Sequence, residues 1–539
     1  MTSTSLHYAT VWEEIADHIP DAPALRHGAL VRSWAEFEAR SARVAGALHE
    51  HGIGRGDGVA CYLYNCAEYF EVFFGPLKLR AVPCNINYRY GSHELLALLE
   101  NSEAKVLFFD AALRDKVAAV ADRATGVRLL VEVGGDSVSP DPGAYAYEEL
   151  ISGAAPAPRI ARDDDDAFLS YTGGTTGLPK GVLFSIGRSA GNCLWFRDLF
   201  LGLDEPLSAV EFAVRHTRDE TPMRAIPASP LMHSTGFIFA SLPTLFAGGT
   251  VTTLRHRSFD AHELLAAVED TGTQVVAIVG DAFALPMVRA LDAGHPGNGP
   301  YETGSLRAIC SAGVAWSAHI KERLFEHIPD VVLVDACGTT EGVTYGIRQI
   351  RRGDALSTAN FDAAPGVRVF SPEGEELGPG EVGMLASPTV ATGYYRDPEK
   401  TATTFFVHDG AQYAMPGDLG RIESDGTLTL IGRGVTTINT GGEKVYPGEV
   451  EEAIKALATV DDCLVIGIPD ERFGQSVAAL VVAKPGRALE TSEVDAAVRA
   501  ALAGYKVPRQ IRIVDEVPRL PNGKVDYETA STLARSGNN

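Results

Sequence analysis

The sequence predicts an α/β protein: a large N-terminal domain of doubly wound, mainly parallel sheets with helices, followed by a small α+β domain. Three observations support this prediction. Strands and helices alternate over the first 110 residues, a glycine-rich string follows a short apolar strand near residue 170, and the pattern changes just after Arg433. A chain of 539 residues is also too long for one ordinary core. We therefore expect two domains, at residues 1–433 and 434–539.

The composition indicates a globular protein and excludes several classes of function. Hydrophobic residues make up 45% and charged residues 22% of the chain, as in globular domains generally. The net charge of −23 opposes binding to nucleic acid or anionic membranes, because phosphate groups attract basic surfaces. There is no apolar run of membrane-spanning length and no signal-peptide pattern. Seven scattered cysteines without a C-x-x-C pair favour reduced thiols, so we expect a cytoplasmic protein.

In the first 110 residues, apolar positions follow the periods of helices and strands in turn. The expected elements are helix 34–51, strand 59–64, helix 68–79, strand 81–85, helix 92–101 and strand 105–110. This alternation predicts a doubly wound parallel sheet. The acidic run Asp163–Asp166 lacks metal-site spacing and is expected to form a solvated linker.

The string from Ser170 to Gly181 reads Ser-Tyr-Thr-Gly-Gly-Thr-Thr-Gly-Leu-Pro-Lys-Gly. Its glycines let backbone N–H groups converge at positive φ into an anion site, and its lysine adds a positive charge. A Walker A loop is excluded, because that motif begins a helix at its lysine, whereas a proline and a glycine flank Lys180 here. The expected phosphate contacts are Thr172, Gly173, Gly174, Thr175, Thr176 and Lys180.

This string resembles the phosphate-loop signature of the adenylate-forming superfamily: acyl-CoA synthetases, luciferases and the adenylation domains of peptide synthetases. Further motifs in the family's order extend to residue 526. The string Ile-Asn-Thr-Gly-Gly-Glu-Lys-Val-Tyr-Pro at 438–447 adds a likeness to actinobacterial acyl-CoA synthetases of the fatty-acyl and steroid-acid type. The resemblance implies ATP, Mg²⁺ and coenzyme A as cofactors and a small-molecule carboxylic acid as the substrate.

Two motifs after the loop imply further site residues. In the string 226–236, His233 corresponds to the residue between the acid pocket and the reacting carboxylate. In the string 311–315, Ala312 and Gly313 correspond to backbone contacts of the nucleotide. The acid pocket itself is expected to involve His233, Phe237, Asp281, Phe283, Val314 and Tyr345.

The string 335–342 resembles the family's aromatic-Gly-x-Thr-Glu motif. The resemblance gives Thr340 to the α-phosphate and Glu341 to the magnesium ion, a hard cation that takes oxygen ligands. It implies nucleotide contacts at Asp335, Ala336, Cys337, Gly338 and Thr339. Cys337 departs from the family, because it replaces the aromatic residue expected to stack on adenine.

The ribose is expected to meet Asp418, since the string 413–418 resembles a Y-x-x-G-D motif with one extra residue. A carboxylate has two oxygens with which to accept both ribose hydroxyls. Arg433, at the family's usual distance downstream, is the second implied nucleotide contact.

The C-terminal region carries two more implied functional segments. In this family the small domain rotates about a hinge between two half-reactions, and Thr436 or Thr437 stands at the hinge position here. After rotation, a hairpin containing Gly441, Gly442 and Lys444 lines the thiol tunnel. Lys524, in Leu-Pro-Asn-Gly-Lys-Val-Asp, corresponds to the catalytic lysine that bridges the acid and the α-phosphate.

The implied reaction joins the acid to AMP with release of pyrophosphate and then transfers the acyl group to coenzyme A. Two anions react in the first step, so catalysis depends on positioning and charge neutralisation. A homodimer is compatible with the sequence, which does not fix the oligomeric state.

Other readings share parts of this pattern. A peptide-synthetase adenylation domain would need an acidic partner for an amino group, and residues 234–242 contain no aspartate. A luciferase-type oxidation is not separated by these motifs. Adenylation with a non-CoA acceptor, such as nitrite activation for an arylamine, also remains open. A non-catalytic ligand sensor would differ from all of these by failing to release pyrophosphate.

Overall fold

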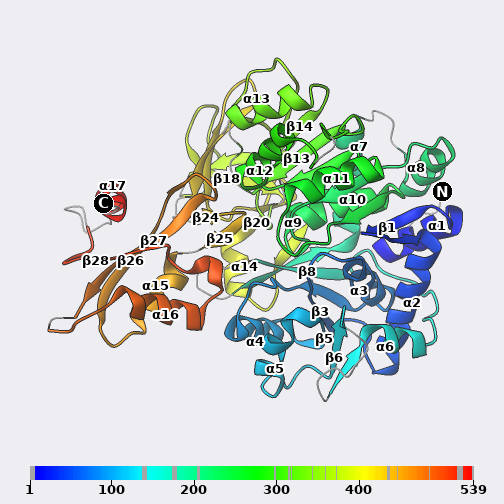
Figure 1. Cartoon of the computed structure of the whole chain (residues 1–539), viewed down its shortest axis with the longest axis horizontal. Helices are drawn as coiled ribbons and strands as arrows, with labels where there is room; N and C mark the ends of the chain where they lie inside the picture. The colour runs from blue at the N-terminus through cyan, green and yellow to red at the C-terminus, as the bar shows by residue number, and fades with distance from the viewer. Residues whose placement is uncertain are drawn as a thin grey trace.

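The computed structural model describes residues 6–135, 143–172, 179–202, 207–296, 299–313, 316, 318–342, 344–357, 360–371, 373–433, 438–445, 447–484, 486–518 and 526–536. It confirms the predicted α/β class, with a large domain of parallel-rich sheets and a small α+β domain. Figure 1 shows the large domain, blue to yellow, beside the orange and red small domain. In the described part of the chain, no helix is both long and apolar enough to cross a bilayer.

One sheet of the large domain contains the predicted alternation of strands and helices. Its strands are, in spatial order, β19 (Ala391–Tyr394), β9 (Lys180–Ser185), β8 (Ala167–Thr172), β4 (Val82–Asn85), β3 (Gly58–Tyr62), β5 (Ala104–Asp110), β6 (Leu129–Val133) and β7 (Ala144–Ala146). The strands from β8 to β7 are parallel neighbours. The connecting helices are α3 (Ala67–Lys78) and α4 (Ser92–Asn101), and α2 (Trp34–Glu50) precedes the first of these strands. The helices lie within one residue of their predicted limits.

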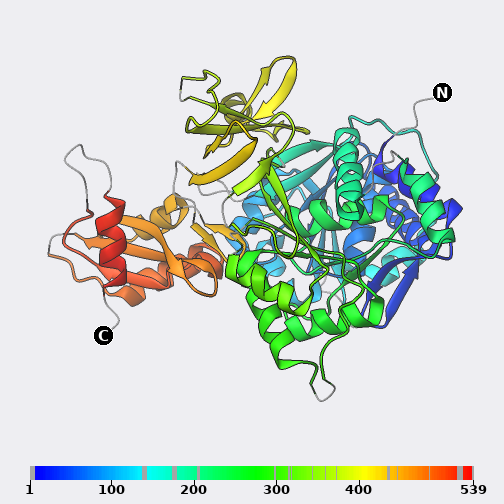
Figure 2. The ribbon, with the colours of Figure 1, turned by 90° about the horizontal axis from the view of Figure 1, so that it is seen from above.

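The other sheet of the large domain has a parallel and an antiparallel part. The parallel part is β1 (Pro23–His27), β11 (Thr250–Thr253), β10 (Arg224–Pro227), β12 (Val275–Ile278), β13 (Ala308–Ala312) and β14 (Val332–Cys337). Beyond β14 the order continues through β15 (Gly346–Ile350), β16 (Asn360–Ala363), β23 (Thr427–Arg433), β22 (Asp418–Ile422) and β18 (Gly383–Pro388), all antiparallel. The pairs β14–β15, β15–β16 and β22–β23 are formed by consecutive elements of the chain, and such direct connections permit antiparallel pairing. Figure 2 shows this yellow part standing out as a lobe.

The small domain has one five-stranded sheet. Its strands are β24 (Ile438–Thr440), β25 (Glu443–Val445), β26 (Val460–Asp470), β27 (Gly474–Ala483) and β28 (Gln510–Ile513), and its helices are α15 (Pro447–Lys455), α16 (Thr491–Ala501) and α17 (Tyr527–Arg535). The β24–β25 hairpin lies at the junction with the large domain, whereas α17 lies on the far side (Figure 1). The predicted hinge residues Thr436 and Thr437 lie outside the described residues, so the boundary at residue 434 stays a prediction.

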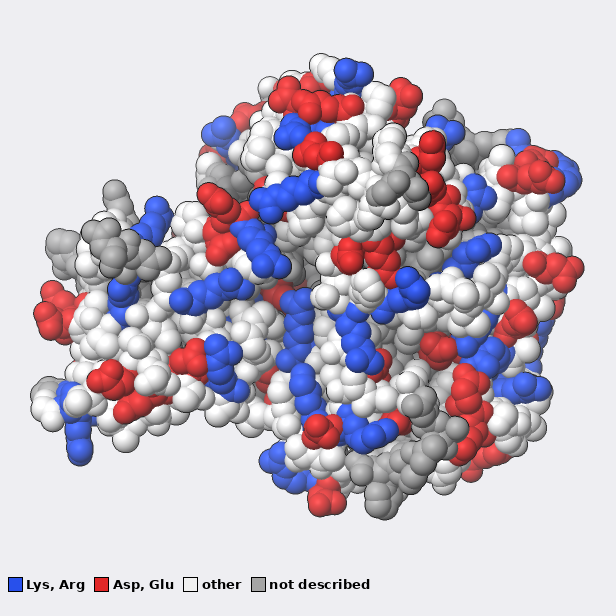
Figure 3. Space-filling view, viewed as in Figure 1, with Lys and Arg blue, Asp and Glu red and all other residues white. Residues whose placement is uncertain are grey.

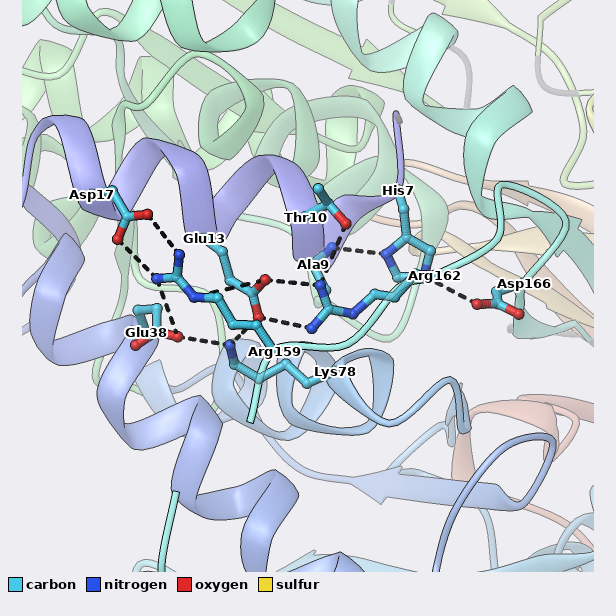
Figure 4. Close-up of polar contacts among 10 residues, drawn as sticks. All are labelled: His7, Ala9, Thr10, Glu13, Asp17, Glu38, Lys78, Arg159, Arg162 and Asp166. Carbon is cyan, nitrogen blue, oxygen red and sulfur yellow. Dashed lines mark hydrogen bonds and ion pairs between the residues drawn. The ribbon is translucent and has the colours of Figure 1, made fainter. Parts of the chain in front are cut away.

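A network of buried charges ties the first helix, α1 (Tyr8–His18), to the segment that leads into β8 (Figure 4). At its centre the Glu13 carboxylate accepts hydrogen bonds from Lys78 Nζ, at 2.6 Å, and from the Arg162 guanidinium, at 2.8 Å. Lys78 is almost fully buried and also donates to Glu38, at 2.8 Å. Because each charge has an opposite partner, the large domain can enclose them.

The prediction of a solvated linker at Asp163–Asp166 is wrong at its last residue. The Asp166 carboxylate accepts hydrogen bonds from the Arg80 guanidinium, at 2.7 and 3.0 Å, and lies 3.6 Å from His7 Nε2. Only the first three residues of the run are exposed. The partners come from distant parts of the chain, so the spacing within the run could not reveal them.

The network predicts that a buried ion pair contributes more to the free energy of unfolding than an exposed ion pair does. We expect Lys78→Met to lower the free energy of unfolding by about 3 kcal/mol, because it removes one cationic partner from the buried Glu13 carboxylate. The measurement is urea unfolding followed by tryptophan fluorescence, since Trp12 and Trp34 lie buried in this region. As a control, Asp17→Asn breaks the exposed pair with Arg159 and should cost less than about 1 kcal/mol. Equal effects of the two changes would contradict the role given to burial.

Candidate active site

Three strands end at one cavity, which we call the central cavity. Thr172, Ala312 and Cys337 are the last residues of β8, β13 and β14, and all three line it. Ligands of open α/β sheets bind outside the carboxyl ends of their strands. The predicted site residues among its lining are Thr172, His233, Ala312, Gly313, Ala336, Cys337, Gly338, Thr339, Thr340, Glu341, Gly442 and Lys444. The structure thus brings together segments that lie more than 270 residues apart, from Thr172 to Lys444.

The Glu341 carboxylate is oriented by a tyrosine. Glu341 is 9% exposed, and its Oε1 accepts a hydrogen bond of 2.7 Å from Tyr394 Oη. The ammonium of Lys180 lies 5.7 Å from the centre of the Tyr394 ring and 3.9 Å from Asp397. Partial burial and the charge of Lys400 lower the pKa of Lys180, against the attraction of Asp397 and Glu341. One tyrosine therefore contacts both groups predicted to meet the phosphates and the metal.

The predicted ribose residues lie opposite each other. Asp418 of β22 and Arg433 of β23 are register partners in this antiparallel pair. The side chain of Arg433 is not among the parts of the chain that the structure describes. Asp418 Oδ2 accepts a hydrogen bond of 3.0 Å from the hydroxyl of the buried Tyr345. Tyr345 is therefore placed beside Asp418, not in the acid pocket where the sequence suggested it.

The carboxylate of Asp335 faces a buried lysine. Lys321 Nζ donates to it at 2.6 Å, and Lys321 is 0% exposed. Burial raises the pKa of Asp335 to about 6, opposed by Lys321 and assisted by the negative charge of Asp281. Asp281 thus acts on Asp335, and it is absent from the described lining of the central cavity. Asp281 was predicted in the acid pocket, whereas the structure places it near Asp335.

The hairpin of the small domain reaches the central cavity. Gly442 has φ +86°, and a Cβ on it would lie 2.8 Å from Val279 Cγ1, so both the turn and the close approach require glycine. The next residue, Glu443, accepts hydrogen bonds from His233 Nε2 at 3.1 Å and from Asn87 Nδ2 at 3.2 Å, and it forms an ion pair with Arg89 Nη1 at 3.0 Å. Burial alone would raise the pKa of Glu443, but His233, Arg89 and Lys506 together lower it to about 2. An ionised carboxylate therefore docks the hairpin on the large domain.

Part of the lining of the central cavity is apolar. This part comprises Phe184, Phe196, Met232, Ile238 and Phe239. A smaller apolar side pocket adjoins it at His233 and Ile238 and is lined by Phe73, Phe168, Leu231 and the predicted Phe237. The segment Phe237–Ser241 is a π-helix, a rare form that often marks functional sites.

A second passage leads from the central cavity towards solvent between the domains. We call it the interdomain channel; it has a volume of about 230 Å³ and shares His233, Gly442 and Glu443 with the central cavity. The predicted acid-pocket residue Phe283 lies here instead, its ring centre 4.4 Å from that of Phe259.

The interdomain channel opens into a wider basic groove of about 920 Å³. Its cationic lining is Arg89, Lys116, Arg255 and Arg257. The aromatic lining includes Tyr64, Tyr88 and Tyr505, and the first two rings are 4.3 Å apart. Figure 3 shows Lys and Arg side chains gathered along the junction of the two domains, on a chain whose net charge is −23.

Some functional residues were missed by the sequence, and some predictions remain open. The sequence did not predict the contacts made by Glu443, Tyr394 and Arg89, because the partners of these residues are distant in the chain. Gly441 lines the interdomain channel. Predicted residues outside the described part of the chain are Gly173, Gly174, Thr175, Thr176, Val314 and Lys524.

Comparison with known proteins gives consistent similarities over the whole chain. The family model "AMP-binding enzyme" matches residues 12–395, and "AMP-binding enzyme C-terminal domain" matches residues 449–524. The chain is 37% identical to the 3-oxocholest-4-en-26-oate–CoA ligase of Rhodococcus rhodochrous, covering 98% of this chain and 95% of that one. It is 35% identical to a medium/long-chain-fatty-acid–CoA/3-oxocholest-4-en-26-oate–CoA ligase of Mycobacterium marinum, covering 98% and 96%. The fold is similar to that of the amide bond synthetase McbA of Marinactinospora thermotolerans, with a TM-score of 0.81, 23% identity and coverage of 98% and 99%.

The hydroxyl of Tyr394 provides a test of how Glu341 is held. We expect Tyr394→Phe to slow ATP- and Mg²⁺-dependent pyrophosphate release about tenfold. A factor of this size corresponds to the free energy of one hydrogen bond to a charged group. The phenyl ring preserves the contact with Lys180, so the change isolates the hydroxyl. The matched control is Tyr395→Phe, which removes a hydrogen bond to the exposed Glu103 and should leave the rate unchanged. Equal rates for the two variants would contradict the role of Tyr394.

Proposed function

The chain belongs to the family of AMP-binding enzymes and is an AMP-forming acid–CoA ligase, and we propose that its acid is a bulky apolar one, fatty or steroidal. The observation that carries this proposal is the set of apolar side chains that lines the central cavity together with Glu341. The two relatives named above act on 3-oxocholest-4-en-26-oate, and one of them also on medium- and long-chain fatty acids.

The lining of the cavity supports an apolar substrate. Three phenylalanines, Met232 and Ile238 contribute apolar surface to its lining. Burying apolar surface there contributes roughly 25 cal/mol per Å², so a long or polycyclic acyl group gains more binding energy than a short acid. A methionine and the π-helical segment at 237–241 supply adaptable surface. The side pocket at Ile238 adds further apolar surface next to this lining.

In the first half-reaction the acid carboxylate attacks the α-phosphorus of ATP, and the bond to the leaving pyrophosphate breaks. The chain supplies positive charge and oriented donors for this step. Lys180 and the threonines of the 172–176 loop meet the terminal phosphates, Thr340 the α-phosphate, and Asp418 the ribose. Lys524 bridges the acid and the α-phosphate.

A magnesium ion fits the donor set around Glu341. Among the described residues no cluster of three or more His, Cys, Asp or Glu could hold a metal by itself. The carboxylates on the described lining of the central cavity are Glu341, next to Thr340, and Glu443, which is already paired with His233 and Arg89. Mg²⁺ in nucleotide sites is held by one or two carboxylates together with phosphate oxygens and water. The ion would neutralise phosphate charge, and the Tyr394 hydroxyl fixes the carboxylate that holds it.

In the second half-reaction the thiolate of coenzyme A attacks the acyl carbonyl and AMP leaves. The basic groove suits the phosphates of coenzyme A, and its tyrosines offer stacking surface for the adenine. The narrower interdomain channel suits the extended pantetheine arm and ends at His233 and Gly442. The contact of Gly442 with both the central cavity and the channel supports a part for the hairpin in this step. Helix α17, which follows the lysine motif, lies on the far side of the small domain.

The acid class is tested by ATP- and Mg²⁺-dependent pyrophosphate release over a panel of acids, with and without coenzyme A. The panel contains short, medium and long fatty acids, steroid side-chain acids, aromatic acids and nitrite. We expect the largest kcat/KM with long-chain or steroidal acids and a CoA thioester by mass spectrometry. Preference for short polar acids would overturn the proposed acid class. Pyrophosphate release without a thioester would indicate another acceptor, and no release at all would indicate a sensor.

The role of Lys524 is tested by separating the half-reactions. We expect Lys524→Ala to lose adenylate formation by at least about a hundredfold, since it removes a charge from the reacting phosphate. Thioester formation from a supplied acyl-adenylate should be largely retained. The control is Lys484→Ala, which changes an exposed lysine of the same domain and should affect neither step. Equal loss of both steps in Lys524→Ala would contradict a rotating small domain.

A further inference from the structure

A lysine of the small domain is buried between two carboxylates at the domain junction. Lys506 is 0% exposed, and its Nζ donates to Glu94 Oε1 of the large domain and to Glu449 Oε2 of the small domain, each at 2.7 Å. Both carboxylates are also buried. Burial opposes the charge of Lys506, but the two carboxylates outweigh that effect and raise its pKa. The three groups form a charged cluster that exists only while the domains are docked as they are here.

The surroundings of this cluster also span both domains. The ammonium of Lys506 lies 5.1 Å from the ring centre of Tyr90 in the large domain and 5.7 Å from that of Tyr505. Ala503 packs into the apolar cluster of α4, which includes Leu95 and Leu99. The segment 503–506 is thus inserted into the large domain, and the charged cluster lies at its end.

Of the two ion pairs of Lys506, one lies within the small domain and the other joins the two domains. Glu449 and Lys506 belong to the same domain, so their contact can persist in any domain arrangement. Glu94 lies in the first turn of α4 of the large domain, and its other oxygen accepts a hydrogen bond from the backbone N–H of Gly91 at 3.1 Å. Of the two ion pairs of Lys506, rotation of the small domain therefore breaks only the one with Glu94, and it exposes both of those charges to water.

We propose that Glu94 and Lys506 form an interdomain latch that holds the hairpin in the central cavity and so favours thioester formation over adenylate formation. The inference rests on the proposed ligase function, because it assigns the docked arrangement to the second half-reaction. Neither side chain lines the described cavities of the site, so both are positioning residues. They act through the Glu443 hairpin, which meets His233 only when the domains are docked.

The first test compares the two half-reactions in Glu94→Gln. The amide keeps the shape and the acceptor for Gly91 but removes the charge that attracts Lys506. We expect thioester formation from a supplied acyl-adenylate to fall about tenfold in kcat, the scale of one charge-assisted hydrogen bond, with the KM for coenzyme A little changed. Adenylate formation, measured as ATP–pyrophosphate exchange, should be unchanged or faster. The control is Glu100→Gln, an exposed residue on the same helix, which should resemble the wild type in both steps.

The second test uses rescue to separate the latch from a general effect on folding. Lys506→Met leaves Glu94 and Glu449 buried together without their cation, and should lower thioester formation by far more than Glu94→Gln does. Adding Glu94→Gln to Lys506→Met removes one of the two buried charges and should restore part of that loss. A merely structural role would make the double variant worse.

These outcomes decide the proposal. A selective loss of the second half-reaction together with rescue in the double variant supports the latch. Wild-type thioester formation in Glu94→Gln, equal loss of both half-reactions, or no rescue would overturn it. If the wild-type chain itself forms no thioester from a supplied adenylate, the ligase function fails and the latch with it, and that result is recognised because the wild type fails too.

Discussion

The interaction on which the site depends most is the burial of the Glu443 carboxylate at the domain junction. An ionised carboxylate is enclosed only where donors replace its water. Here the donors come from Asn87, Arg89 and His233, all in the large domain. The hairpin can therefore enter only at a position where these three side chains converge, which is the edge of the central cavity. One charge thus aligns the small domain with the reacting end of the site.

The position of that cavity follows from the topology. In the parallel parts of both sheets of the large domain, the carboxyl ends of neighbouring strands lie at one edge, and β8 from one sheet and β13 and β14 from the other end at the same space. The loops after these strands carry the hydroxyl, glycine and carboxylate groups that a nucleotide and a metal ion require. The rigid strands fix where those loops begin, so residues far apart in the chain meet without a long loop.

The sequence predicted those parts of the protein in which the signal is local. Helix α4 was predicted from Ser92 to Asn101, where it lies, and the motif residues Thr172, Ala312, Thr340 and Glu341 all line one cavity. The residues that position them could not be predicted, because their partners lie far along the chain. Tyr394 is 53 residues from Glu341 and Glu443 is 210 from His233.

The errors have the same physical cause. Asp166 looked like part of a solvated run because its partners Arg80 and His7 are remote. Phe283 and Tyr345 looked like pocket residues by order in the chain, yet one faces the interdomain channel and the other holds Asp418. A pattern in sequence gives the chemistry of a side chain and the element that carries it; the direction in which the side chain points depends on packing against elements that no local pattern describes.

The polarity of the domain junction suits the domain rotation proposed above. If the two domains separate during each turnover, a large apolar contact would be unfavourable, because exposing that surface costs free energy in proportion to its area. Charged groups such as Glu94, Lys506, Arg89 and Glu443 regain hydration when they part, so the penalty of separation is smaller. They also fix one docked geometry, since a buried charge that lacks its partner is strongly unfavourable. Polar contacts at this junction therefore allow the domains to separate while permitting few ways for them to come together again.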